Sequence, residues 1–256
     1  MRVVLVGAGN LATNLAVALQ QAGHAIMQVF SRTSRSAEAL AQRVGAPAIT
    51  DLHQLVQDAD IYIVSITDSA LASLDYTAFP TDALVVHTAG SIPMDVIPLP
   101  RRGVLYPMQT FSRQRIVDFA DIPLFVEAAT EDDTQWLSDF ARTINNKVYR
   151  LSSANRLYLH LAAVFCSNFV NHCYAMSEDI LRQHGGLPFS VMLPLIDEVA
   201  AKVHSVGPHE AQTGPAIRHD ENVVRHHLAL LADQPDLQEI YSIMSNSIQV
   251  SRLVVE

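Results

Sequence analysis

The chain has 256 residues and a formal net charge of −9. Apolar residues make up 49% of it and charged residues 17%, which excludes a disordered or low-complexity chain and leaves room for one large or two small globular domains. Both halves are acidic, so the charge pattern excludes a nucleic-acid-binding surface.

Membrane insertion and secretion are not expected. No apolar run approaches the roughly 18 residues that a membrane span needs. The chain enters a short apolar run at Val3 without the longer apolar segment of a signal peptide. We therefore expect a cytoplasmic protein without a membrane or nucleic-acid partner.

Up to residue 151 the sequence alternates short apolar runs with helical stretches. Continuous apolarity is typical of strands covered on both faces, as in a parallel sheet with helical crossovers. The expected strands are Val3–Val6, Ala25–Phe30, Ile61–Ile66, Ala83–His87, Gly103–Tyr106, Leu124–Glu127 and Lys147–Leu151. Helices are expected around Leu11–Leu19, at Ala37–Val44 and at Asp132–Ile144. The predicted fold class is α/β with a mostly parallel sheet.

After Ser152 the pattern changes to long helical stretches without strand signals. Helices are expected over about 153–183, 188–206, 221–232 and 235–253, with the helix-ending pairs Gly185-Gly186 and Gly207-Pro208 between the first three. The sequence therefore predicts two domains, an α/β domain over residues 1–151 and an all-helical domain over residues 152–256.

The strongest motif follows the first expected strand. It reads Gly7-Ala8-Gly9-Asn10-Leu11-Ala12, a Gly-x-Gly-x-x-Ala turn that leads into an amphipathic helix. The first glycine permits a tight turn, the second lets a pyrophosphate approach the backbone, and the alanine allows close helix packing. The N–H groups at the helix start then face the phosphates. The motif predicts a Rossmann-like, dinucleotide-binding domain, with a glycine-rich turn that binds no ligand as the alternative.

The end of the second expected strand indicates which dinucleotide binds. A domain that prefers NAD usually carries an acidic residue about 20 residues after the turn, where it holds the ribose hydroxyls. No acidic residue lies between Gly7 and Glu38, and the strand end reads Phe30-Ser31-Arg32-Thr33-Ser34-Arg35. Guanidinium and hydroxyl groups there suit a 2′-phosphate, so the sequence favours NADP. Alternatively, Arg32 and Arg35 are solvated residues that open the next helix.

Three further loops follow expected strands at the same sheet edge, where open parallel sheets bind ligands. Those expected to contact the cofactor are Ile66, Thr67, Asp68, His87 and Thr88, and those expected to contact a substrate are Gly90, Ser91, Tyr106, Gln109 and Thr110. Each loop alone is compatible with ordinary turn chemistry, but three at one edge favour a binding site.

Together these motifs resemble a known family. The glycine turn, Phe30-Ser-Arg-Thr, His87-Thr-Ala-Gly-Ser, Tyr106-Pro-Met-Gln-Thr-Phe and Thr213-Gly-Pro-Ala are similar to those of bacterial Rossmann-like proteins with a C-terminal helical domain of unknown function, generically named NADP oxidoreductases. A more distant similarity is to pyrroline-carboxylate reductases and β-hydroxyacid dehydrogenases. The resemblance implies NADP binding and a helical domain that forms a homodimer. It implies no particular substrate.

One position departs from those distant relatives. β-Hydroxyacid dehydrogenases carry a Lys-x-x-x-Asn pair on the first long helix, with the lysine as general acid or base, whereas this chain has Val164 four residues before Asn168. His160 lies two turns before Asn168 on nearly the same face, and an imidazole can donate a proton near neutral pH. We expect His160 as the catalytic acid, with Asn168 and Asn171 orienting the substrate. The alternative is a core histidine and a structural asparagine.

The same helix predicts the assembly. Apolar residues cover more than one of its faces, which is more than packing on one neighbour requires. These residues are Leu157, Leu161, Val164, Phe165, Phe169 and Val170. We expect a homodimer formed mainly through the helical domain, with burial at the centre of its own domain as the alternative.

The sequence therefore favours an NADPH-dependent reductase that acts on a small carbonyl or imine bound between the two domains. A second hypothesis is an NADP-binding sensor or scaffold dimer without turnover, which the missing lysine favours. A metal-handling protein is a third and weaker hypothesis, because the spacing of histidines such as His204, His209 and His219 matches no compact ligand motif. No metal site is expected.

Overall fold

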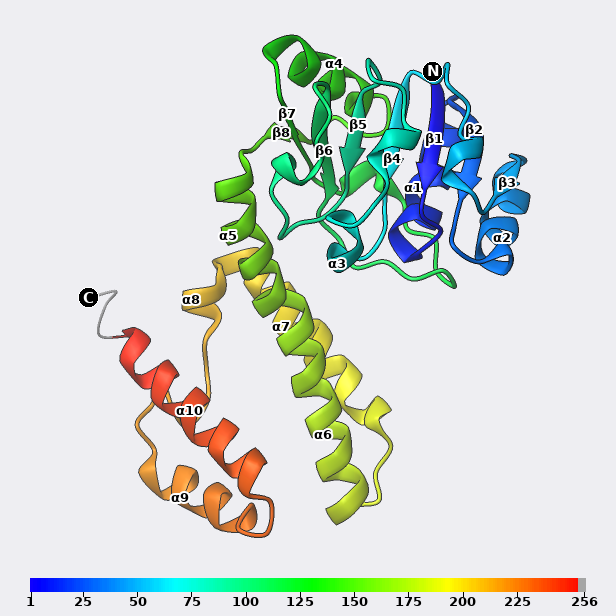
Figure 1. The fold of residues 1–256 in the computed structure, drawn as a ribbon. Coiled ribbons are helices and arrows are strands. Elements are labelled where there is room, and N and C mark those ends of the chain that lie inside the picture. The colour runs from blue at the N-terminus through cyan, green and yellow to red at the C-terminus, as the bar shows by residue number, and fades with distance from the viewer. Residues whose placement is uncertain (253–256) are drawn as a thin grey trace. The chain divides into compact units, whose positions relative to one another are not determined.

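The computed structural model describes residues 1–252. It divides into two compact units, Met1–Asn168 and a second unit that starts at Phe169. The first contains a sheet and its covering helices, and the second consists of helices and connecting turns (Figure 1). Helix α5 (Ser153–Val164) belongs to the first unit, so that unit extends beyond the sheet-forming residues.

An eight-stranded sheet forms the centre of the first unit, in the order β3-β2-β1-β4-β5-β6-β7-β8 (Figure 1). The strands are β1 (Arg2–Val6), β2 (Ala25–Phe30), β3 (Ala48–Ile49), β4 (Ile61–Val64), β5 (Val85–His87), β6 (Arg102–Pro107), β7 (Leu124–Ala128) and β8 (Val148–Arg150). Neighbouring strands run parallel except β6 and β7, which are antiparallel. The predicted α/β fold with a mostly parallel sheet is confirmed.

Both faces of this sheet are buried, as the continuous apolarity of its strands predicts. In β1, Val3 and Leu5 join one core, which also contains the apolar face of α1 (Asn10–Gln21), while Val4 and Val6 join a second core. Seven strands lie where the apolar runs predict them. The eighth, β3, was not predicted, because it has only two residues and neither is buried.

The helices of the first unit begin and end at recognisable signals. After α1 come α2 (Ser34–Val44), α3 (Asp68–Leu71), α4 (Glu131–Arg142) and α5, together with the short 3₁₀ helices η1 (Leu52–Gln54), η2 (Tyr76–Ala78), η3 (Met94–Val96) and η4 (Phe119–Asp121). Helix α2 ends at Gly45, whose φ of 65° is left-handed. The Thr130 hydroxyl caps α4 by accepting the N–H of Asp133 at 3.1 Å.

The second unit contains the remaining helices. They are α6 (Val170–His184), the 3₁₀ helix η6 (Phe189–Met192), α7 (Leu193–Val206), α8 (Pro208–Ala211), α9 (Glu221–Leu230) and α10 (Pro235–Arg252). The helix ends at Gly185 and Gly207 agree with the sequence signals. Of the described helices, none combines the length and apolar character that crossing a membrane requires.

One helix prediction is corrected. The expected single helix over residues 153–183 is interrupted by a π-helical turn at Phe165–Phe169. Within this turn the Ser167 hydroxyl donates a hydrogen bond to the Ala163 carbonyl at 2.6 Å, a local bond that competes with regular helix geometry. Periodicity did not reveal the interruption, because the apolar pattern continues through it.

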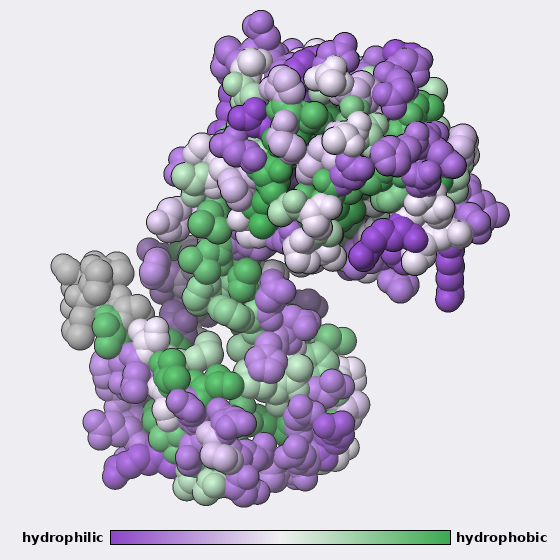
Figure 2. Space-filling view, viewed as in Figure 1, coloured by the Kyte–Doolittle hydropathy of each residue, from purple (hydrophilic) through white to green (hydrophobic). Residues whose placement is uncertain are grey.

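Burial differs sharply between the two units. Among described residues of the second unit, only Ala216 and Ser245 are buried. Large apolar side chains of α7 and α10 are exposed, as are those of α5 at the end of the first unit, and Figure 2 shows apolar surface over the helices. They include Leu157, Leu161, Leu195, Val199, Ile243 and Val250.

Candidate functional site

A cavity of about 930 Å³ lies at the carboxyl ends of β1, β2, β4, β5 and β6. The strand order reverses between β1 and β4, and such a switch point is where open parallel sheets bind ligands. The predicted site residues that line it are Gly7, Ala8, Gly9, Asn10, Leu11, Ser31, Arg32, Thr33, Ile66, Thr67, Asp68, Thr88, Gly90, Tyr106, Gln109 and His160. The structure therefore brings most of the expected site residues together.

The glycine turn has the geometry that a pyrophosphate requires. Gly7 has a φ of +121°, and a Cβ there would lie 2.0 Å from the Ser65 carbonyl oxygen, so only glycine fits. A Cβ at Gly9 would meet nothing within 4 Å, which leaves open space in front of the backbone. Helix α1 starts at Asn10 without an acidic residue in its first turn, so its N–H groups can face an anion. These residues fit a dinucleotide.

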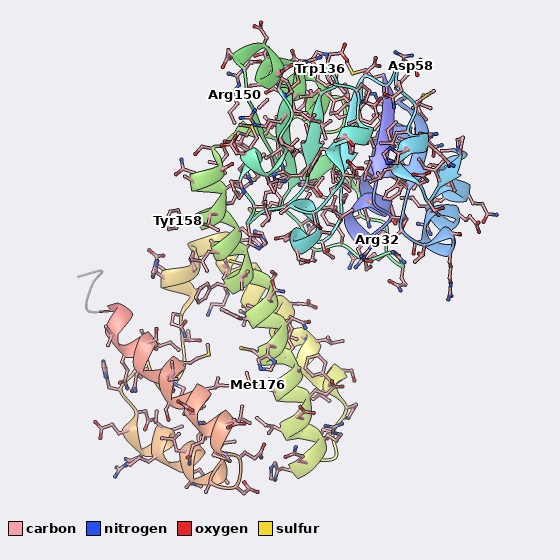
Figure 3. The ribbon with its side chains drawn as sticks, viewed as in Figure 1. Arg32, Asp58, Trp136, Arg150, Tyr158 and Met176 are labelled. Carbon is pink, nitrogen blue, oxygen red and sulfur yellow. The ribbon has the colours of Figure 1, made fainter. Side chains whose placement is uncertain are left out.

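Arg32 extends from the end of β2 into the same cavity and is exposed. Figure 3 labels Arg32 at this edge of the sheet and Asp58 and Trp136 at the opposite edge. Arg35, in the first turn of α2, does not line the cavity. Of the residues expected to bind a 2′-phosphate, Arg32 and its hydroxyl neighbours Ser31 and Thr33 therefore line the cavity.

Tyr106 and His160 meet in the cavity wall. The Tyr106 hydroxyl lies 3.1 Å from His160 Nδ1, which brings together β6 and α5. Burial raises the pKa of Tyr106 above its ordinary value near 10, so its hydroxyl stays protonated and can donate. A Cβ at Gly90 would lie 2.5 Å from His160 Nδ1 and 2.9 Å from Tyr106 Cζ. The pair therefore depends on a glycine at position 90.

A buried ion pair fixes the start of α5. Arg156, one turn before His160, has a side chain that is 1% exposed and lies 2.7 Å from Glu127 of β7. Arg156 also donates to the Ile92 carbonyl at 2.6 Å, and the Ser153 hydroxyl donates to Glu127 at 2.6 Å. These contacts join α5 to the sheet and so determine where His160 lies.

The structure does not support the expected contact between His87 and the cofactor. His87 is fully buried and does not line the cavity. Its Nδ1 accepts the Ala89 N–H at 3.1 Å, and Nε2 lies 3.3 Å from the Pro93 carbonyl. Burial lowers its pKa from 6.5 to about 4, and the charge of Arg156 acts in the same direction. His87 bonds to the loop that carries Gly90 and does not line the cavity.

Four other predicted residues do not line the cavity. Ser91 donates to the Asp68 carboxylate, and Asn168 accepts from the Ser167 hydroxyl at 3.0 Å. Thr110 follows Gln109 outside the cavity wall, and Asn171 belongs to the second unit. Their expected contacts with a substrate stay predictions.

Sequence reasoning missed one cation of this cavity. Arg113 lines it from the loop that follows β6, and its guanidinium donates to the Ala8 carbonyl of the glycine turn. The two residues are 105 positions apart, so no local pattern relates them. A basic residue shortly after the polar loop Gln109–Ser112 was the available signal, but basic loop residues are usually solvated.

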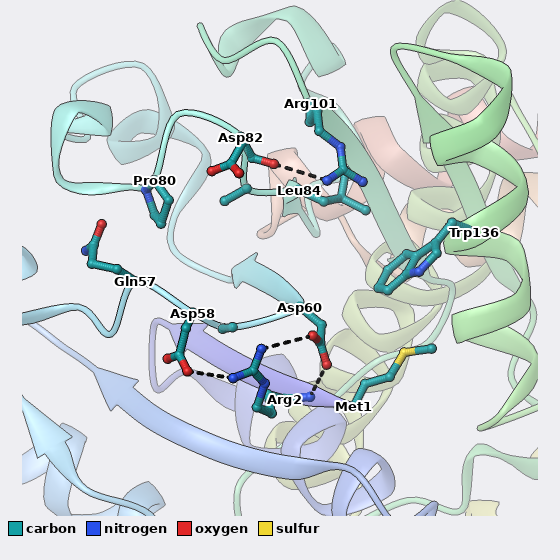
Figure 4. A pocket seen from close by; sticks show the side chains of 12 residues that line it. Met1, Arg2, Gln57, Asp58, Asp60, Pro80, Asp82, Leu84, Arg101 and Trp136 are labelled. Atoms are coloured by element: carbon teal, nitrogen blue, oxygen red, sulfur yellow. Dashed lines mark hydrogen bonds and ion pairs between the residues drawn. The ribbon is translucent and has the colours of Figure 1, made fainter.

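A second cavity, of about 550 Å³, lies at the amino ends of the strands (Figure 4). Its two arginines are paired with carboxylates of the chain, since Arg2 pairs with Asp58 and Asp60, and Arg101 pairs with Asp133. Over residues 1–252, no group of three or more His, Cys, Asp or Glu side chains is arranged to hold a metal ion. The first cavity is therefore the candidate site.

The fold and the site define a dinucleotide-binding α/β protein. Residues 2–89 match the family model described as "NADP oxidoreductase coenzyme F420-dependent", and residues 122–248 match a domain of unknown function. Searching curated proteins finds no match.

Several solved structures are similar over nearly the whole chain. A Bacteroides fragilis protein, provisionally named an NADP oxidoreductase, is 53% identical with a TM-score of 0.91, and the match covers 97% of each chain. A Thermotoga maritima protein is 20% identical, covering 96% of this chain and 99% of the other, with a TM-score of 0.79. An imine reductase from Myxococcus stipitatus, in complex with NADP⁺, is 18% identical, covering 99% and 95%, with a TM-score of 0.67.

The chain belongs to the NADP oxidoreductase family that combines such an α/β part with this domain of unknown function. The resemblance expected from the sequence motifs is thereby confirmed, as is NADP as the cofactor of the family. The two more distant structures share the fold.

Proposed function

We propose that the protein is an NADPH-dependent reductase of a small carbonyl or imine. One observation carries the proposal: a single cavity joins the glycine turn, Arg32 and the Tyr106–His160 pair. A phosphate-binding turn and a proton-donating pair in one cavity are the two parts that a nicotinamide-dependent reduction needs.

The residues at one end of the cavity suit the cofactor. The backbone N–H groups after Gly9 would hold the pyrophosphate at the start of α1. Arg32, with the Ser31 and Thr33 hydroxyls, would hold the 2′-phosphate of the adenosine. Bound NADPH would supply the hydride for the reaction.

His160 would supply the proton. The Tyr106 hydroxyl, whose pKa burial raises, lies 3.1 Å from His160 Nδ1 and so orients the imidazole ring. A carbonyl oxygen that gains negative charge needs such a donor, whereas an already protonated imine does not. Tyr106 therefore orients the ring, and His160 in its protonated form gives a proton to the carbonyl oxygen as the hydride adds to the carbonyl carbon.

The catalytic hypothesis is tested with a panel of small keto acids and cyclic imines, by following NADPH oxidation. The expected result is turnover of at least one class, with His160→Ala lowering carbonyl reduction by about 10²–10⁴-fold and leaving NADPH affinity nearly unchanged. Carbonyl reduction at the parent rate in His160→Ala would remove His160 from the mechanism. It would also shift the balance towards imine chemistry.

A second candidate function is a sensor or scaffold that binds NADP without turnover. It is favoured by Val164, which stands where the distantly similar dehydrogenases carry their catalytic lysine. The same panel separates the two functions, because a sensor binds NADPH without consuming it with any substrate.

We also propose that the chain functions as a homodimer. Exposed apolar residues recur at intervals of four on α5 and α7, and examples are Leu157 and Leu161, and Leu195 and Val199. Their exposed fractions are 50%, 52%, 60% and 55%. Stripes of this kind are typical of helices that pack against a further layer. A second copy of the chain is the partner that the resemblance implies.

A further inference from the structure

The loop after β6 is tied to α1 by a single buried side chain. Asn14 of α1 is fully buried, and its amide nitrogen donates to the Asn10 carbonyl at 2.9 Å and to the Ser112 carbonyl at 2.8 Å. Its amide oxygen accepts the Val117 N–H at 2.9 Å. Both ends of the segment 112–117 are thus held against the first turns of the helix that opens at the glycine turn.

Arg113 lies inside this held segment and points back to the turn. Its guanidinium donates to the Ala8 carbonyl and lines the same cavity as Gly7 and Gly9. Among residues 1–252, Arg113 forms no ion pair with a carboxylate. A guanidinium has five N–H donors, so one bond to Ala8 leaves further donors and a full positive charge beside the turn.

The charge at this place suits a pyrophosphate. The first turn of α1 carries no acidic residue, and its N–H groups give only partial positive charge. A pyrophosphate carries two negative charges, and a planar guanidinium matches phosphate oxygens with paired hydrogen bonds. Arg113 contacts the turn itself, whereas Arg32 follows β2, so the two cations suit different phosphates of one dinucleotide.

We propose that Arg113 binds the pyrophosphate of the dinucleotide together with the start of α1, and that Asn14 positions Arg113 through the 112–117 segment. The proposal rests on the proposed function, since it concerns the same dinucleotide site. It separates the roles of two arginines. Arg32 distinguishes NADP from NAD, and Arg113 supports both.

The test is calorimetric titration of NADP⁺, NAD⁺ and adenosine 2′-phosphate into purified variants. Arg113→Gln should weaken NADP⁺ and NAD⁺ by a similar factor, about 10- to 100-fold for a charged hydrogen bond, and leave adenosine 2′-phosphate unaffected. Arg32→Gln should weaken NADP⁺ and adenosine 2′-phosphate while leaving NAD⁺ unaffected. Arg115→Gln is the matched control, because Arg115 is exposed in the same segment and does not line the cavity.

The role of Asn14 has its own readout. Asn14→Ala should lower affinity for both dinucleotides in the parent protein but change it little in Arg113→Gln, with folding followed by circular dichroism. Independent effects that multiply in the double variant would overturn the positioning role.

Two negative outcomes are distinguishable. Parent-like binding of both dinucleotides by Arg113→Gln, or equal weakening of adenosine 2′-phosphate, overturns the role of Arg113 alone. A parent protein that binds neither dinucleotide overturns the proposed function and this inference with it.

Discussion

Gly9 and Gly90 both line the site, but the space around their α-carbons differs. Substitutions at these two glycines can therefore test cofactor binding and catalysis separately. A Cβ at Gly9 would meet nothing within 4 Å, and one at Gly90 would lie 2.5 Å from His160 Nδ1. Gly9 thus keeps space free for a ligand, whereas Gly90 lets two protein side chains meet.

Gly9→Ala should keep the parent melting temperature and lose dinucleotide affinity, because the methyl group occupies space that only the ligand uses. We expect a loss of about tenfold or more, the effect of displacing one good phosphate contact. Titration with NADP⁺ measures the affinity, and thermal unfolding measures the melting temperature. Parent-like affinity would show that the pyrophosphate lies elsewhere.

Gly90→Ala should have the complementary effect. The added methyl forces Tyr106 and His160 apart, and misplacing a catalytic group by about 1 Å can cost roughly 10²-fold in rate. Turnover of a carbonyl substrate should therefore fall about 100-fold, more than dinucleotide affinity does. If turnover and affinity fall by the same factor, the glycine serves the cofactor and not the Tyr106–His160 pair.

His87 makes stability depend on pH. Burial lowers the pKa of His87 from 6.5 to about 4 in the folded chain. Between pH 4 and pH 6.5, His87 is therefore protonated in the unfolded chain but neutral in the folded chain. Stability contributed by neutral His87 is complete above about pH 6.5 and is lost as the pH falls towards 4. Between pH 7 and pH 5 the free energy of unfolding should fall by about 2 kcal/mol from this residue.

Urea unfolding of the parent and of His87→Gln at the two pH values measures this contribution. The variant should be less stable at pH 7 but should lose about 2 kcal/mol less than the parent on going to pH 5. Comparing the two proteins cancels contributions from other groups, such as His24, whose pKa burial also lowers. If the free energy of unfolding falls equally in both proteins, His87 is not the source of this pH dependence.

At the scale of elements, α5 depends on one buried ion pair. Glu127 is the carboxylate partner of Arg156, whose side chain is 1% exposed. Removing the carboxylate charge leaves a buried cation without compensation, which typically costs about 3–5 kcal/mol. Glu127→Gln should therefore lower the free energy of unfolding by an amount in this range.

An exposed ion pair between α4 and β8 provides the control. Glu131 pairs with Arg150, with side chains that are 75% and 44% exposed. Glu131→Gln should change stability by less than about 1 kcal/mol, as is usual for exposed ion pairs. Urea unfolding of both variants tests the contrast, and equal effects would mean that α5 does not depend on the Glu127–Arg156 pair.

The elements were predictable to the extent that their patterns are local. Seven strands could be located because both faces of the sheet are covered, which makes each strand continuously apolar. The two-residue strand β3 has no such run, and the π-helical turn preserves the apolar spacing of the helices around it. The hydrophobic pattern of the sequence therefore reveals neither feature.

The site was predictable where one strand and its following turn define it. The glycine turn and Arg32 are such features, and both line the cavity. The contacts between Arg113 and Ala8 and between Tyr106 and His160 join residues 105 and 54 positions apart. Only the folded sheet edge brings these residues together, so local spacing could neither find Arg113 nor exclude His87.

At the scale of the whole molecule, the uneven burial predicts the assembly. The sheet has two apolar cores, whereas the described part of the second unit has only Ala216 and Ser245 buried. Burying one exposed leucine side chain contributes about 1.5–3 kcal/mol, so several exposed leucines and valines favour a stable interface. We expect light scattering at micromolar concentration to give about twice the monomer mass of 28.1 kDa.

Charged substitutions locate that interface. Leu161→Glu on α5 and Val199→Glu on α7 replace apolar side chains that are 52% and 55% exposed in the single chain, so neither should disturb the core of the monomer. In a dimer, each would bury an unpaired carboxylate, at a cost of several kcal/mol per copy. Both variants should give the monomer mass, whereas Tyr149→Glu, at a 51% exposed residue of β8, should stay dimeric. A monomeric parent, or a dimer that survives both charges, would contradict an interface built from these helices.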